Sequence, residues 1–243
     1  MEKVVIYAVL TGLSLLIGVA VTLYFKLKQK FIAAVLAFGA GTLICALTFG
    51  LMEEAFRHGG FDAVVIGFLL GGSAFIGGDF LIHKFGGRKH KRIQHLESDI
   101  EATGKVVTLG SILDNIPESI ALGVALVNPG GIGLLMASAI FLSNLPEGIA
   151  SSSGLKKEGF SNLKIISIWL LVAISVIAIT ILSYIFLDTL DLNNLGIIES
   201  FAAGAILAMV ADSMIPEAYE EGGFLVGLIT VGGFLTAFLL SKA

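Results

Sequence analysis

Two short segments of the chain share one pattern of carboxylate, amide and proline residues, 29 positions apart. Residues 114–118 read Asp-Asn-Ile-Pro-Glu, and residues 143–147 read Ser-Asn-Leu-Pro-Glu. On a helix, residues three or four positions apart share a face, so each segment would direct its Asn and Glu side chains to one side. Carboxylate and amide oxygens are ligands for hard and borderline divalent cations. The paired segments therefore predict a metal site between two helices.

The predicted ligands come from both segments: Asp114, Asn115, Glu118, Ser143, Asn144 and Glu147. Three further acids near the ends of other apolar segments are candidates for entry and exit steps: Glu54, Asp212 and Glu217. Each motif proline also leaves the carbonyl four residues earlier without its helical hydrogen bond, which adds further oxygen ligands. The alternative interpretation is that the motif only kinks and packs two helices. A second copy of the motif favours the metal site.

The acids of these segments have no basic residue near them in the sequence. The stretch from Val106 to Leu155 contains no Lys, Arg or His. At 1.5 Å per residue, Glu118 and Glu147 fall within about 3–6 Å of the middle of their apolar segments. A charge at that depth of a bilayer costs about 2.5–3.5 kcal/mol on insertion scales. The acids expected in the membrane are Asp79, Asp114, Glu118, Glu147 and Asp212, and protons or dissolved cations must neutralise them.

The elements that position these residues are long and apolar. Of the 243 residues, 56% are hydrophobic and 14% are charged, and the mean hydropathy is +0.95. Charged residues make up about a quarter of an ordinary soluble domain. A spanning helix needs about 20 apolar residues, and eight segments meet that length. They are residues 4–25, 32–53, 61–82, 105–127, 131–155, 164–187, 195–218 and 224–241.

The basic residues predict how these segments are oriented. Twelve of the fifteen Lys and Arg residues fall in alternate loops, which the positive-inside rule places in the cytoplasm. Both termini are then outside, and a cytoplasmic loop at about 83–104, which contains His83, His90 and His95, joins the third and fourth helices. We expect one transmembrane transporter domain over residues 1–243, with the first apolar segment retained.

Two internal repeats indicate how the helices are arranged. A shift of 163 residues aligns Glu54-Ala55-Phe56 with Glu217-Ala218-Tyr219, and a shift of 29 aligns the two motif segments. In each pair the two segments run in opposite directions, and inverted repeats with broken helices are typical of transporter binding sites. The predicted fold is an all-α integral membrane protein with eight transmembrane helices in a 3+2+3 arrangement.

At residues 115–118 and 144–148 the chain resembles the ZIP (Zrt-, Irt-like protein) family of metal transporters. The resemblance implies eight spans, a binuclear metal site on the fourth and fifth helices, and ligand roles for Asn115, Glu118, Asn144 and Glu147. The chain is a divergent member in this respect, because Asp114 and Ser143 stand at the positions of the family's histidines. Without imidazoles the site is limited to oxygen ligands, which leaves zinc, manganese and iron(II) open as cargo.

Our prediction is therefore a divalent metal transporter of the cell membrane, multi-pass and not an enzyme, that brings metal into the cytoplasm by alternating access. The expected partners are divalent metal ions and the lipid bilayer, with a homodimer left open and no nucleic acid. No tightly bound cofactor is expected. One alternative is a proton- or sodium-coupled carrier of another solute. Another is an intramembrane aspartyl protease, suggested by Gly77-Gly78-Asp79, which lacks a second motif on a neighbouring helix.

Overall fold

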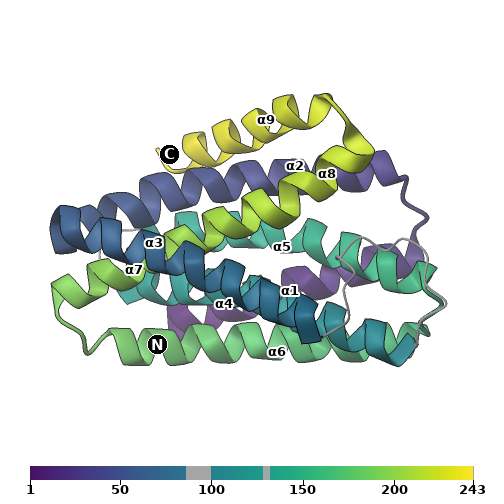
Figure 1. Cartoon of the computed structure of the whole chain (residues 1–243), viewed down its shortest axis with the longest axis horizontal. Helices are drawn as coiled ribbons and strands as arrows, with labels where there is room; N and C mark the ends of the chain where they lie inside the picture. Colours follow the sequence, from purple (N-terminus) through teal and green to yellow (C-terminus); the bar gives the residue numbers. More distant parts are fainter. Residues whose placement is uncertain (86–99, 128–131, 243) are drawn as a thin grey trace.

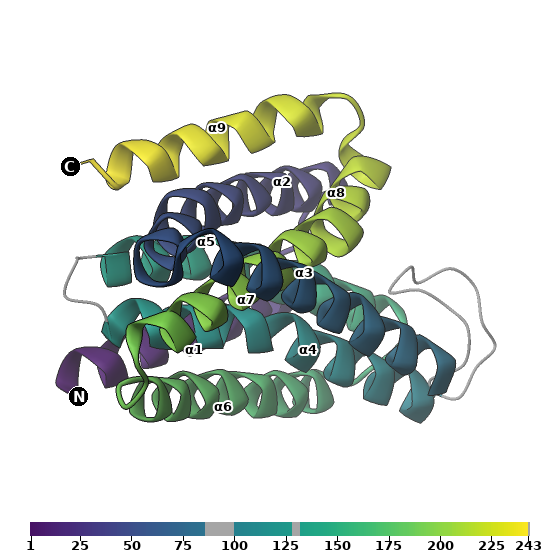
Figure 2. The same ribbon diagram turned by 60° about the vertical axis from the view of Figure 1, so that its left-hand side comes forward.

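The computed structural model describes residues 1–85, 100–127 and 132–242, and every element in them is helical. Two of these elements, η1 and η2, are short π-helices. The elements are α1 (Glu2–Tyr24), α2 (Gln29–Ala46), η1 (Leu47–Met52), α3 (Glu53–Phe85), α4 (Ile100–Val127), α5 (Ile132–Lys157), α6 (Asn162–Leu187), α7 (Leu192–Met209), η2 (Val210–Met214), α8 (Ile215–Gly222) and α9 (Leu225–Leu240). They form one elongated bundle, in which the start of α1 and the end of α9 lie at the same end (Figures 1 and 2).

Six helices of the described part are long and apolar enough to cross a membrane, and α9 is a shorter apolar helix. The all-helical membrane class predicted from the sequence is thus found, while the count of eight helices stays a prediction. One of the six helices runs from Gln29 to Ile82, which is 54 residues. A straight helix of that length would measure about 80 Å, against about 30 Å for the hydrocarbon layer.

The long helix from Gln29 contains a sharp break at Gly60, whose φ is 68° and ψ is −162°. Gly223, 163 residues later, has nearly the same conformation, with φ 62° and ψ −147°. Only glycine adopts this region of backbone space without strain. The π-helices η1 and η2 also begin 163 residues apart, at Leu47 and Val210. The sequence repeat therefore corresponds to a repeated backbone: helix, π-helix, short helix and a glycine break.

Glycines hold the helices of this repeat close together. A Cβ added at Gly71 on α3 would overlap the carbonyl oxygen of Phe201 on α7, and one at Gly233 on α9 would overlap that of Phe38 on α2. Phe38 and Phe201 are themselves equivalent under the 163-residue shift. The pairs α3–α7 and α2–α9, which pack most extensively in the bundle, thus use the same kind of backbone-to-backbone contact.

The remaining helices form a second group. Helix α1 packs on α5 and α6, and α4 packs on α6. A buried apolar cluster that includes Leu15, Trp169 and Val172 fills the space among α1, α5 and α6. The main contacts between the two groups are made by α2 with α5 and by α4 with α7, so the motif helices α4 and α5 lie where the groups meet.

Two predicted boundaries differ from the structure. Helix α3 continues to Phe85 and α4 begins at Ile100, so both ends of the loop expected at about 83–104 are helical. Apolarity marks only the part of a helix that lies in lipid, and polar residues extend a helix beyond it. The middle of that loop, including His90 and His95, lies outside the described residues, as does the side chain of His83.

Candidate metal site

Helices α4 and α5 carry the two motif segments, and each has its proline inside the helix, at Pro117 and Pro146. The motif residues lie deep in the protein. Of the six predicted ligands, Glu147 is half-buried and the other five are buried. Asn144 is fully covered and Glu118 is 2% exposed. The helices therefore direct these polar side chains to the protein interior and not to lipid.

Reciprocal hydrogen bonds join the two motifs across the helix interface. The Asn115 amide on α4 donates to Glu147 Oε1 on α5 over 3.0 Å. In return, the Ser143 hydroxyl on α5 donates to Glu118 Oε1 on α4 over 3.2 Å. The Asn144 amide donates to the carbonyl oxygen of Thr11 on α1 over 3.2 Å. Each motif glutamate is thus held by a polar side chain of the opposite motif.

Three oxygens of the predicted ligands remain without a hydrogen bond. Asn115 Oδ1, Glu118 Oε2 and Asn144 Oδ1 are buried and have no hydrogen-bond donor among the described residues. In each case the other polar atom of the same side chain is already bonded, which fixes the orientation of the unpaired oxygen. A buried acceptor without a donor costs about 1–3 kcal/mol. A bound cation would supply the missing interaction.

A small cavity lies beside these residues, between α4, α5, α8 and the η2 segment. Its volume is about 20 Å³, which is room for a single ion or one to two waters. Asp114, Glu147 and Glu217 line it together with Ser213 and other residues. The cavity gathers carboxylates from both motif helices and from the 163-residue repeat.

The structure separates the other sequence candidates. Glu217 and Asp212 are both exposed, but only Glu217 lines the cavity. Glu54 lies in a different polar cluster, described below. Within the described residues, no group of three or more His, Cys, Asp or Glu side chains is close enough to hold a metal ion. A metal site at the motifs therefore has to include amide, hydroxyl or water oxygens.

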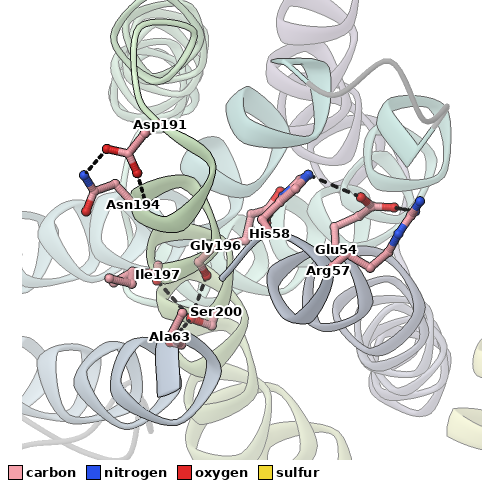
Figure 3. Close-up of polar contacts among 10 residues, drawn as sticks. Glu54, Arg57, His58, Ala63, Asp191, Asn194, Gly196, Ile197 and Ser200 are labelled. Atoms are coloured by element: carbon pink, nitrogen blue, oxygen red, sulfur yellow. Dashed lines mark hydrogen bonds and ion pairs between the residues drawn. The ribbon is translucent and has the colours of Figure 1, made fainter. Parts of the chain in front are cut away.

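The sequence interpretation missed a second cluster, formed by the first turns of α3 and by α7. Glu199 on α7 is fully buried, and His58 Nδ1 lies 2.9 Å from its Oε2. On the other side of the ring, His58 Nε2 lies 3.7 Å from Glu54 Oε2. Arg57 Nη1 donates to Glu54 Oε1 over 2.7 Å, so the imidazole and the guanidinium flank one carboxylate (Figure 3).

The sequence contained indications of this cluster, but they lay in two segments far apart in the chain. Glu199 is an acid inside the apolar segment 195–218, where a carboxylate is expensive. His58 falls between two apolar segments and so resembled a loop residue. Nearby, the Ser200 hydroxyl donates to the carbonyl oxygen of Ala63 over 3.0 Å (Figure 3), which links α7 to α3 beside the cluster.

Apolar helices enclosing buried carboxylates and amides are the arrangement of a membrane transport protein. A family model described as ZIP zinc transporter matches residues 81–241, which is more than half of the chain. A relative from Arabidopsis thaliana described as "Putative zinc transporter" is 26% identical over 186 residues, 75% of this chain. The chain spans 29% of that relative's length.

The chain belongs to the ZIP family of metal transporters, as the resemblance in the two motifs predicted. It is accordingly a multi-pass membrane protein of a transporter family and not an enzyme. Both α4 and α5, with all six motif residues, lie inside the matched segment.

Proposed function

We propose that this protein carries divalent metal ions into the cytoplasm, and that the ion passes through a carboxylate and amide site between α4 and α5. The observation that carries the proposal is the set of three buried, unpaired oxygens on Asn115, Glu118 and Asn144. They come from both motif helices and include one carboxylate, so a cation is the ligand that suits them. The name of the Arabidopsis relative supports a metal ion as cargo.

Each motif residue has a role in this proposal. Glu118 and Glu147 provide negative charge that offsets the loss of the ion's hydration. Asn115 and Asn144 provide neutral oxygens, and the hydrogen bonds that their amide nitrogens donate fix where those oxygens point. Asp114 and Glu147 line the adjacent cavity with Glu217, which gives the ion a next position of like chemistry.

The proposed topology has eight passes in a 3+2+3 arrangement, both termini outside, and one transporter domain over residues 1–243. Gly60 and Gly223 would separate successive passes. Both chain ends at one end of the bundle fit an even number of passes (Figure 1). The tight glycine contacts of α2, α3, α7 and α9 suit a rigid frame. The group α1, α4, α5 and α6 would then move against that frame in alternating access.

The ligand chemistry bears on which metal is carried. Every donor at the motif site is an oxygen, because Asp114 and Ser143 replace imidazole ligands. Oxygen ligands suit manganese and iron(II) well, while zinc more often takes nitrogen or sulfur ligands in proteins. We therefore expect a broad divalent range that includes zinc.

Uptake of metal into proteoliposomes tests the proposal. Glu118→Ala and Glu147→Ala are each expected to lower the initial rate of zinc or manganese uptake by at least about tenfold, since each removes a charged ligand that is buried or half-buried and worth about 2–5 kcal/mol. Asp188→Asn, at an exposed acid just after α6, is the matched control and should transport normally. Unchanged uptake in both glutamate variants would refute the site. A sodium- or proton-coupled carrier of another solute predicts no metal uptake in any form.

A further inference from the structure

The cluster of Glu54, His58 and Glu199 is not part of the proposed transport site between α4 and α5, and its geometry suggests a role of its own. His58 and Glu54 are four residues apart in the helical stretch before Gly60, so they lie one above the other on the same face. Their side chains are 13% and 11% exposed, whereas the Glu199 side chain is fully buried. The cluster therefore runs from the protein surface to a buried carboxylate on another helix.

The contact between His58 and Glu199 determines whether the other ring nitrogen, His58 Nε2, carries a proton or a lone pair. With Glu199 ionised, its carboxylate can only accept, so His58 Nδ1 carries the proton and donates it over 2.9 Å. A neutral imidazole protonated at Nδ1 presents a lone pair at Nε2. Metal-bound histidines almost always donate their other ring N–H to a carboxylate, a backbone carbonyl or water, and this bond fixes the tautomer and the ring orientation.

The distance between His58 Nε2 and Glu54 Oε2 fits a shared metal ion better than a hydrogen bond. It is 3.7 Å, beyond the usual hydrogen-bond range of about 2.7–3.2 Å. Two lone pairs that face each other repel unless a cation lies between them. With metal–nitrogen and metal–oxygen bonds of about 2.0–2.1 Å, two ligands of one ion lie about 3.3 Å apart in tetrahedral geometry and about 4 Å apart when opposite each other.

We propose that Glu54 and His58 form a second divalent metal site, at the junction of α3 and α7, with Glu199 as the carboxylate that orients the histidine. Two protein ligands leave the remaining positions to water, which suits an ion that binds briefly and leaves. A borderline cation such as zinc or cobalt(II) fits a nitrogen and an oxygen ligand. The inference does not rest on the α4–α5 site.

Replacing Arg57 tests the proposal, because the proposal predicts whether metal affinity rises or falls. Its guanidinium is bonded to the other oxygen of Glu54 and is 65% exposed, so it competes with a metal ion for that carboxylate. If the cluster were only a structural link between α3 and α7, removing Arg57 would have no reason to favour metal. If the cluster binds metal, Arg57→Gln frees an oxygen and removes a positive charge, and binding becomes tighter.

The experiment is zinc binding by equilibrium dialysis on the purified full chain, in a Glu118→Gln/Glu147→Gln background that silences the transport site. The background is expected to retain one zinc ion, and His58→Gln or Glu54→Gln to lose it. Glu199→Gln, which keeps the side-chain size, should weaken binding by about 10–100-fold. Arg57→Gln should tighten it by about two- to fivefold. The control replaces the other three histidines, His83, His90 and His95, by Gln and should leave this ion bound.

Two results would overturn the proposal. The first is unchanged zinc stoichiometry and affinity in His58→Gln, which would mean that His58 takes a proton or an ion pair and not a metal. The second is weaker binding in Arg57→Gln. Thermal unfolding of each variant without metal separates a loss of binding from a loss of folding. Because the transport site is silenced throughout, a negative result here leaves the proposed transport function standing, and failed uptake would leave this site standing.

Discussion

Glu118→Gln is the most informative single substitution at the motif site. The Glu118 side chain is 2% exposed, its Oε1 accepts from Ser143, and its Oε2 is unpaired within the described structure. Glutamine keeps the size of the side chain and one oxygen but removes the charge. Removing one partner of a buried charge pair costs about 3–5 kcal/mol. Even the lower end of that range weakens metal binding by about 150-fold.

This weaker metal binding should be measurable as a smaller rise in melting temperature on adding metal. Metal at 100 times its dissociation constant stabilises the wild-type protein by about 2.7 kcal/mol, which for a chain of this size corresponds to a shift of about 5–10 °C. At the same metal concentration the variant would be near its own dissociation constant. It would gain only about 0.3 kcal/mol, or about 1 °C.

The assay is thermal unfolding in detergent with and without zinc or manganese, with every variant in a His58→Gln background so that the second proposed site does not contribute to the shift. Ser119→Ala is the matched control, because Ser119 is also 2% exposed and its hydroxyl also lacks a partner among the described residues. The control is expected to keep the full metal-induced shift. A full shift in Glu118→Gln would show that the unpaired carboxylate oxygen is not a metal ligand. Loss of the shift in Ser119→Ala would show that the effect is not specific to the Glu118 carboxylate.

Two further predictions concern the scaffold. Gly71→Ala should lower the free energy of unfolding by about 1–3 kcal/mol, because the added Cβ would overlap the carbonyl oxygen of Phe201. The control is Gly77→Ala on the same helix, whose added Cβ meets no atom within 4 Å. It should be neutral or slightly stabilising in the same thermal unfolding assay. Equal effects of the two substitutions would contradict the close packing of α3 on α7. At the start of α7, the backbone N–H of Asn194 donates to Asp191 and lowers the pKa of that exposed carboxyl. A carboxyl whose pKa is lowered by folding stabilises the fold at pH values above its pKa in the unfolded chain, about 3.9, and this contribution is lost as pH falls through the folded pKa. The stability of wild type relative to Asp191→Asn should therefore decline below about pH 4. Melting curves over a pH series would measure this.

Sequence alone determined the class of this protein and the chemistry of its motif segments. The cost of placing each residue in lipid depends mainly on that residue, so composition and apolar length were sufficient to predict an all-helical membrane protein. In the same local way, the two Asn-x-Pro-Glu segments indicated α4 and α5 as the helices of the proposed metal site. The shift of 163 residues predicted a repeat, and the glycine breaks at Gly60 and Gly223 follow it.

Tertiary structure decided which polar side chains meet. Whether Glu217 lines the cavity of Asp114 and Glu147, and Asp212 does not, depends on the rotation of α8 and η2 relative to α4 and α5. The pairing of His58 with Glu199 joins residues 141 positions apart. No local pattern encodes such a contact, because it is set by how α3 packs on α7 through backbone contacts between glycines and neighbouring carbonyls. The sequence supplied the ionisable groups, and helix packing determined their partners.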